Sequence, residues 1–224
     1  MSHLLPRRIF LPIALIILGV LAITSAIAPI SYDLGKYILD YDPPLVDPLV
    51  SSSGFSPIVL NSRDLSTDFT QASSWFVSPP ALSTASASVE FFSLSIPRLD
   101  MNNIPVEVNG SDLKKNAIHF PGTAIPGDWG NSVVFGHSSL PQFYRPGNPV
   151  TIFNRLPGIR TSDNIIVMYD GIVYRYKVSL TMEITPQDIQ VLEQKFDRRQ
   201  LTLVTCVPLG TYWRRFVAIA QLVN

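Results

Sequence analysis

The chain has 224 residues, of which 46% are hydrophobic and only 15% charged, and its 17 basic residues equal its 17 acidic residues in number. This balance argues against a protein that binds nucleic acid or another polyanion, because such proteins carry a basic excess. The single cysteine excludes an intramolecular disulfide. Together with three histidines it cannot supply the usual soft ligands of a zinc site, so we expect no metal and no other cofactor.

The first predicted element is a long apolar helix. Residues 9–30 carry no charged side chain, follow Arg7 and Arg8, and are about long enough to cross a bilayer once. The positive-inside rule then predicts a cytoplasmic tail at 1–8, a transmembrane signal-anchor at 9–30 and an extracytoplasmic remainder. A cleaved signal peptide is the alternative, since residues 26–28 read Ala-Ile-Ala, although Pro29 after such a cut disfavours processing.

Residues 31–87 form the second region, which is rich in serine and proline and lacks periodic apolar spacing. This composition predicts a spacer between the membrane and a folded domain. Trp75, Phe76 and Val77 interrupt the polar sequence and could dock on that domain. The sequence leaves this point open.

The third region, residues 88–224, consists of short β-type runs. Asp170-Gly171 between two such runs predicts a hairpin, and Thr185-Pro186 predicts the start of a short helix. Single helical turns are expected at 111–115 and 151–156. Many short strands in one region predict a mainly β fold, a single closed or nearly closed barrel with a few short helices. The predicted strands are 89–96, 105–108, 132–136, 165–169, 172–180, 202–206 and 216–223.

The cysteine is the first candidate for chemistry. Cys206 closes the apolar run 201–206, and Arg214 and Arg215 follow within one short loop. A free cysteine in a strand is often inert buried filler. An exported protein with one unpaired thiol beside cationic side chains suggests a reactive group instead, because thiolates are favoured near arginine.

A cysteine nucleophile needs a base or imidazolium partner, and acyl transfer needs positive charge or N–H donors at the developing oxyanion. His137 directly follows an apolar strand and Gly136. His119 is the remaining competitor, because His3 lies on the predicted cytoplasmic tail. Cys206, His137 and one of the two arginines would supply the required groups.

These residues lie in a pattern that resembles the sortases, cysteine transpeptidases of bacterial surfaces. The TLVTC run ending at Cys206, an arginine about nine residues later and a Gly-His pair at 136–137 match this family specifically. The likeness covers about residues 89–224. Further matching runs are LSIPRL at 94–99 with Pro105-Val106, PGT at 121–123, PGDWGN at 126–131, FNRL at 153–156 and TPQD at 185–188 with Val191-Leu192.

The resemblance implies a catalytic barrel domain over residues 88–224 and a role for each site residue. Cys206 would attack the Thr–Gly bond of an LPxTG-like sorting signal in a secreted protein. His137 would act as general acid and then base, and Arg215 would bind the substrate backbone and stabilise the oxyanion. The acceptor would be an amine, such as a cell-wall precursor or a pilin lysine. Arg214 is the weaker choice, because Arg215 is followed at once by an apolar strand, as the arginine of the family is. Adjacent strand residues point to opposite faces, so only one of the two arginines can face the thiol.

Two loops depart from the family pattern, and two other functions remain open. Tyr212 and Trp213 are bulky for the loop between cysteine and arginine, and residues 138–149 match no expected sequence. The subclass is therefore undetermined. The alternatives to a transpeptidase are a cysteine peptidase that only hydrolyses, and a membrane-tethered binding module in which Cys206 is inactive.

Overall fold

The structure, a computed structural model, describes residues 7–39, 68–77 and 89–223. The chain divides into two compact units, Met1–Asp47 and Pro48–Asn224, and each is described by itself. The tail 1–8 falls mostly outside the described residues, as do most of the predicted spacer 31–87 and His3.

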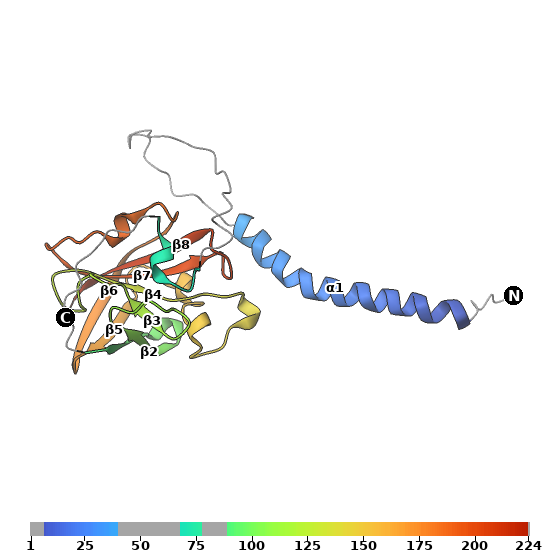
Figure 1. The fold of residues 1–224 in the computed structure, drawn as a ribbon, viewed down its shortest axis with the longest axis horizontal. Helices are drawn as coiled ribbons and strands as arrows, with labels where there is room; N and C mark the ends of the chain where they lie inside the picture. The colour runs from blue at the N-terminus through green and yellow to red at the C-terminus, as the bar shows by residue number, and fades with distance from the viewer. Residues whose placement is uncertain (1–6, 40–67, 78–88, 224) are drawn as a thin grey trace, which may run out of the picture. The chain divides into compact units, whose positions relative to one another are not determined.

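The first unit contains α1, an α-helix over Arg7–Leu39 (Figure 1). This helix includes the whole of the predicted apolar segment 9–30, and its apolar side chains, such as Leu15, Ile16 and Leu18, are exposed. Within the described residues, no helix combines the length and hydropathy that crossing a membrane requires. The transmembrane assignment of 9–30 is thus not shown by the structure and stays a prediction.

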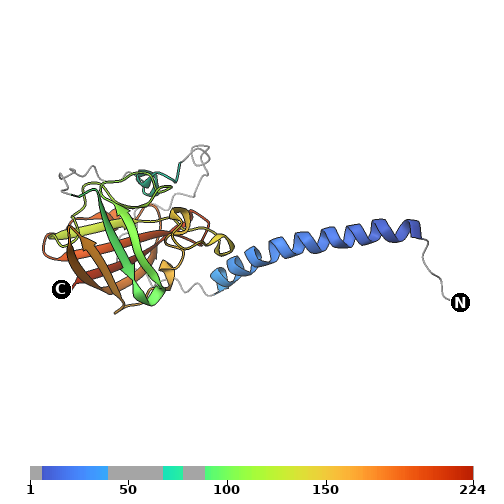
Figure 2. The same cartoon turned by 90° about the horizontal axis from the view of Figure 1, so that it is seen from below.

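The second unit contains a closed barrel of eight strands in the order β1-β2-β3-β4-β7-β8-β6-β5 (Figure 1, and from below in Figure 2). The pairs β2/β3 and β4/β7 are parallel, and the other neighbours are antiparallel. The predicted mainly β barrel is confirmed. The strands are β1 (Phe91–Ile96), β2 (Met101–Glu107), β3 (Ala117–His119), β4 (Gly130–Phe135), β5 (Asn164–Tyr169), β6 (Ile172–Ile184), β7 (Arg199–Val207) and β8 (Arg214–Leu222).

All seven predicted strands are present, and β3 is the strand that the sequence did not predict. With three residues it is too short to show an alternating pattern. Strands β2 and β6 are longer than expected, because pairing with β1 and β8 carries them past their apolar runs. Local propensity sets the centre of a strand better than its ends.

The helical predictions were wrong in type or position. Residues 113–115 form a turn, and the helix expected from Thr185 begins only at Ile189, as the 3₁₀ helix η7 (Ile189–Leu192). The Thr185 N–H and hydroxyl both donate to Asp188 Oδ2 at 2.8 Å, so the capping residues close a turn instead. Between 149 and 158 there are two 3₁₀ helices, η5 (Pro149–Thr151) and η6 (Leu156–Gly158).

Two apolar clusters cover the two faces of the barrel wall. The inner core receives buried side chains from all eight strands and fills the barrel. The outer cluster receives strand residues only from β3, β4, β6, β7 and β8, and therefore lies on one side of the wall. It comprises Ala72, Trp75, Phe76, Leu113, Ile118, Phe120, Val133, Phe135, Ile184, Leu192, Val204, Cys206 and Val217.

Candidate active site

Cys206 lies near the end of β7 on the outer face of the barrel. Side chains alternate along a strand, and here Leu203 and Val207 belong to the inner core while Val204 and Cys206 belong to the outer cluster. Both faces of β7 are covered, which agrees with the burial of every residue from Leu201 to Val207. The thiol is buried, and Cys206 is only 1% exposed.

Arg215 stands directly opposite Cys206 in the antiparallel pair of β7 and β8. Directly opposite residues of such a pair share one face of the sheet, so the guanidinium and the thiol lie on the same side. Arg214 stands opposite Val207, whose side chain belongs to the inner core. The structure therefore brings Arg215 to the cysteine and directs Arg214 to the other face.

His137 lies on the other flank of the cysteine. In the parallel pair of β4 and β7, Phe135 stands beside Val204 in the last pair of the register. Continued for two residues, the same register sets His137 level with Cys206 and on the same face. The Gly136 N–H donates to the Val204 carbonyl at 3.1 Å, which keeps the two chains paired past the end of β4. His137 just past the end of β4, Cys206 on β7 and Arg215 on β8 thus form a row on the outer face.

Of the other two histidines, His3 lies outside the described residues, and His119 is not part of this row. His119 stands opposite Val134, an inner-core residue, and is fully buried on the inside of the barrel wall. Its Nε2 lies 3.0 Å from the Ala124 carbonyl. Among the described residues, no three His, Cys, Asp or Glu side chains gather in a way that could hold a metal ion.

A short segment that we call the strap, residues 68–77, covers the row from outside. Trp75 and Phe76 are buried in the outer cluster, and the Trp75 ring lies 5.6 Å from the His137 ring. The strap is held at both ends by backbone hydrogen bonds, from Leu113 to Thr70 at 2.9 Å and from Val77 to Pro186 at 3.0 Å. The aromatic residues of the predicted spacer therefore do dock on the barrel.

The strap also accepts hydrogen bonds from the guanidinium of Arg215. Arg215 Nε and Nη2 donate to the Trp75 carbonyl at 3.1 and 2.8 Å, and Nη1 donates to the Tyr212 carbonyl at 2.9 Å. The guanidinium carbon also lies 5.4 Å from the centre of the Trp75 ring. Arg215 is fully buried, and the Trp75 carbonyl accepts two of its hydrogen bonds.

Burial dominates the electrostatics of the covered site. Burial raises the pKa of the Cys206 thiol to about 11, although the charge of Arg215 acts in the opposite direction. Burial likewise lowers the pKa of His137 to about 4, assisted by Lys114 and opposed by Asp112 and Asp68. Near neutral pH the covered site therefore holds a thiol and a neutral imidazole. The thiolate expected from the neighbouring arginine does not form in this state.

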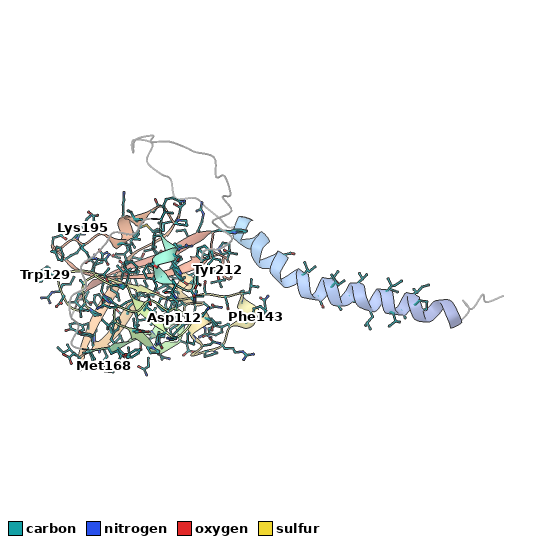
Figure 3. The ribbon with its side chains drawn as sticks, in the orientation of Figure 1. Asp112, Trp129, Phe143, Met168, Lys195 and Tyr212 are labelled. Carbon is teal, nitrogen blue, oxygen red and sulfur yellow. The ribbon has the colours of Figure 1, made fainter. Side chains whose placement is uncertain are left out.

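The two loops that depart from the family pattern meet beside the site. The Tyr212 ring stacks on Phe69 of the strap, with centroids 4.3 Å apart and planes at 10°. A Cβ on Gly210 would lie 2.8 Å from the Leu140 backbone nitrogen, so the two loops pack closely. In Figure 3, Tyr212 and Phe143 lie toward one side of the barrel and Trp129, which precedes β4, toward the other.

Comparison with known proteins identifies the family of this fold and site. The family model described as Sortase domain matches residues 94–223, which is more than half of the chain and includes the whole row. The chain belongs to the sortase family. Sortase domains are cysteine transpeptidases, so this chain is an enzyme of that type.

Solved sortase structures agree with the assignment. A lid mutant of sortase A from Corynebacterium diphtheriae is 27% identical, with 62% of this chain and 73% of that chain covered at a TM-score of 0.53. A sortase D5 transpeptidase from Clostridium perfringens is 25% identical, with 60% and 79% covered at 0.51. Sortase C-1 from Actinomyces oris, at 24% identity and a TM-score of 0.53 over 61% and 76%, supports the fold. Comparison with curated protein sequences gave no match.

Proposed function

We propose that this sortase cleaves an LPxTG-like sorting signal and transfers the cleaved protein to an amine. The observation that carries the proposal is the row of His137, Cys206 and Arg215 on one face of three adjacent strands. This arrangement places a nucleophile between a proton carrier and a cationic hydrogen-bond donor. Acyl transfer requires these three groups.

The first half of the reaction forms a thioester. Cys206 Sγ attacks the threonine carbonyl carbon of the Thr–Gly bond, and Arg215 donates hydrogen bonds to the oxyanion that develops. When the C–N bond breaks, His137 gives its proton to the leaving glycine amine. The thioester then joins the sorted protein to Cys206.

The second half passes the acyl group on. An acceptor amine, such as that of a cell-wall precursor or a pilin lysine, attacks the thioester while His137 accepts its proton. An amide forms and the Cys206 thiol is regenerated. If water attacks instead, the enzyme is a hydrolase, and if no thioester forms, the chain is a binding module.

The strap must leave before either half can proceed. Arg215 already donates to the Trp75 carbonyl, and Trp75 packs against His137. Burial is the main cause of the pKa shifts of both Cys206 and His137. Uncovering the site therefore moves both pKa values towards their ordinary range and narrows the gap between them, so that proton transfer from the thiol to the imidazole costs less free energy.

Mass spectrometry of the full-length chain mixed with LPxTG-like peptides tests the proposal. We expect an enzyme–peptide adduct through Cys206, and a ligated product when a glycine peptide is added. Hydrolysed peptide alone, with and without the added amine, would favour the hydrolase. The absence of any adduct across the peptide library would favour the binding module.

His137→Ala should lower kcat by at least about 10²-fold, the usual effect of losing a general acid–base. His119→Gln is the matched control, because its amide can still donate to the Ala124 carbonyl inside the barrel. We expect this variant to remain active. If His119→Gln folded but lost activity while His137→Ala stayed active, His119 would be the proton carrier.

We also propose that residues 9–30 anchor the enzyme in the cell membrane with the barrel on the extracytoplasmic face. The absence of charge in this segment and the two preceding arginines support the proposal. Protease added to spheroplasts should then digest the region after residue 31. Protection of that region, or a processed form free in the medium, would contradict the anchor.

A further inference from the structure

The orientation of the His137 ring depends on its main chain. Among the described residues, the imidazole ring of His137 contacts the ring of Trp75, and no hydrogen bond holds either of its nitrogens. Trp75 belongs to the strap, which leaves when substrate binds according to the proposed function. Once the strap has left, the backbone around His137 has to aim the imidazole at Cys206.

Two consecutive residues of the loop before η6 hold that backbone. The Phe153 N–H donates to the His137 carbonyl at 3.0 Å. The Ser139 N–H donates to Asn154 Oδ1 at 2.7 Å, and Asn154 Nδ2 donates to the Ser139 carbonyl at 2.9 Å. The Asn154 amide therefore hydrogen-bonds both the N–H and the carbonyl of the Ser139 main chain, as the backbone of a neighbouring strand would.

The same short stretch is tied to the cysteine strand on its other side. Ser138 Oγ donates to the Cys206 carbonyl at 2.7 Å. Residues 137–139 thus lie between β7 and residues 153–154. His137 accepts a hydrogen bond from Phe153, Ser138 donates to Cys206, and Ser139 pairs with Asn154. Loss of the Asn154 side chain leaves the bonds of His137 to Phe153 and of Ser138 to Cys206 and frees the main chain of Ser139, two residues after His137.

Asn154 can serve as a fixed support because its surroundings are rigid. It is 7% exposed and lies between Phe153 and Leu156, both inner-core residues. The Phe153 ring packs so closely on Gly136 that a Cβ there would come within 2.5 Å of the ring. Close packing of this kind resists displacement.

We propose that Asn154 is a positioning residue for His137 in the transfer reaction. The inference rests on the role of His137 under the proposed function. A primary amide is the side-chain group that offers a donor and an acceptor in one plane. Alanine removes both bonds to Ser139, whereas serine can restore only one.

The test compares Asn154→Ala and Asn154→Ser with Asn148→Ala in the full-length chain. Asn148 lies in the same loop region, and its side chain accepts a hydrogen bond from Val150, at the start of η5. We expect Asn154→Ala to lower kcat by roughly 10- to 100-fold with KM little changed, since small misplacements of reacting groups cost this much. Asn154→Ser should fall between alanine and the wild type, and Asn148→Ala should match the wild type.

Nuclear magnetic resonance titration of His137 supplies a readout that a purely structural role would not change. In Asn154→Ala the looser loop admits water, so the pKa of His137 should rise from about 4 towards its ordinary value. In Asn148→Ala it should stay low. This comparison needs no turnover, so it tests Asn154 even if the wild type forms no peptide adduct and the proposed function fails.

Three results would overturn the inference. One is a folded Asn154→Ala with the kcat of Asn148→Ala, and another is a reduced kcat with an unchanged His137 titration. If Asn154→Ala does not fold, Asn154→Ser decides the matter. A folded serine variant with wild-type kcat and wild-type titration would then exclude the positioning role.

Discussion

Cys206→Ala should abolish both cleavage and transfer, with a loss of at least about 10⁴-fold in kcat. The thiol is the nucleophile in the proposed reaction, and alanine has no group that can form the thioester. The expected measurement is the disappearance of the enzyme–peptide adduct in mass spectra, together with the loss of ligated product. Full activity in the alanine variant would rule out Cys206 as the nucleophile.

The fold should survive this substitution, and the melting temperature is the control. Cys206 is buried in the outer cluster between strap and barrel, and alanine removes one heavy atom from it. Deleting one buried methylene-sized group costs about 1 kcal/mol, or about 2–4 °C in Tm for a domain of this size. A much larger fall would mean that loss of activity reflects unfolding.

Arg215→Lys should be severely impaired, by about 10²-fold or more in transpeptidation rate. The guanidinium of Arg215 donates through three nitrogens to carbonyl oxygens in the covered state. The same planar fork would donate to substrate carbonyls once the strap has left. Lysine carries an equal charge on a single nitrogen and cannot reproduce this geometry.

Arg214→Lys is the matched control, because the two arginines are neighbours on one strand but face opposite sides of the barrel wall. Opposite Val207, Arg214 lies away from the thiol, and its lysine or alanine variant should lose little activity. Circular dichroism of all variants separates catalytic loss from misfolding. Equal losses at both positions, or a greater loss at Arg214, would contradict the assignment of Arg215 as the arginine that binds the substrate.

Much of the catalytic region could be predicted from the sequence. The apolar runs of β4 and β7, each ended by a chemically distinctive residue, indicated buried strands that carry His137 and Cys206. Strand alternation indicated that only one of Arg214 and Arg215 can face the thiol, and the resemblance to the family pattern favoured Arg215. The register of β7 and β8 places Arg215 opposite Cys206. The closed barrel followed from many short strands with a hairpin signal at Asp170-Gly171.

The short and irregular elements could not be predicted in the same way. β3 has three residues, and its pairing with β2 and β4 is determined by the rest of the barrel and not by its own pattern. The turn at Thr185 had the residues of a helix start but closes on Asp188. Local signals of this strength yield to the packing around them.

By itself, the sequence determined the approximate positions of all strands except β3, the single thiol and the histidine and arginine candidates, because these depend on residue type and on local periodicity. Only the tertiary structure decided that His137 and not His119 stands beside Cys206, since strands 69 residues apart in the chain had to pair in one register. It also decided that Trp75 covers the row and holds Arg215 with its carbonyl, and that Asn154 supports the loop after His137. These contacts join residues that are distant in the chain through main-chain groups. Every residue carries such groups, so no sequence pattern predicts these contacts.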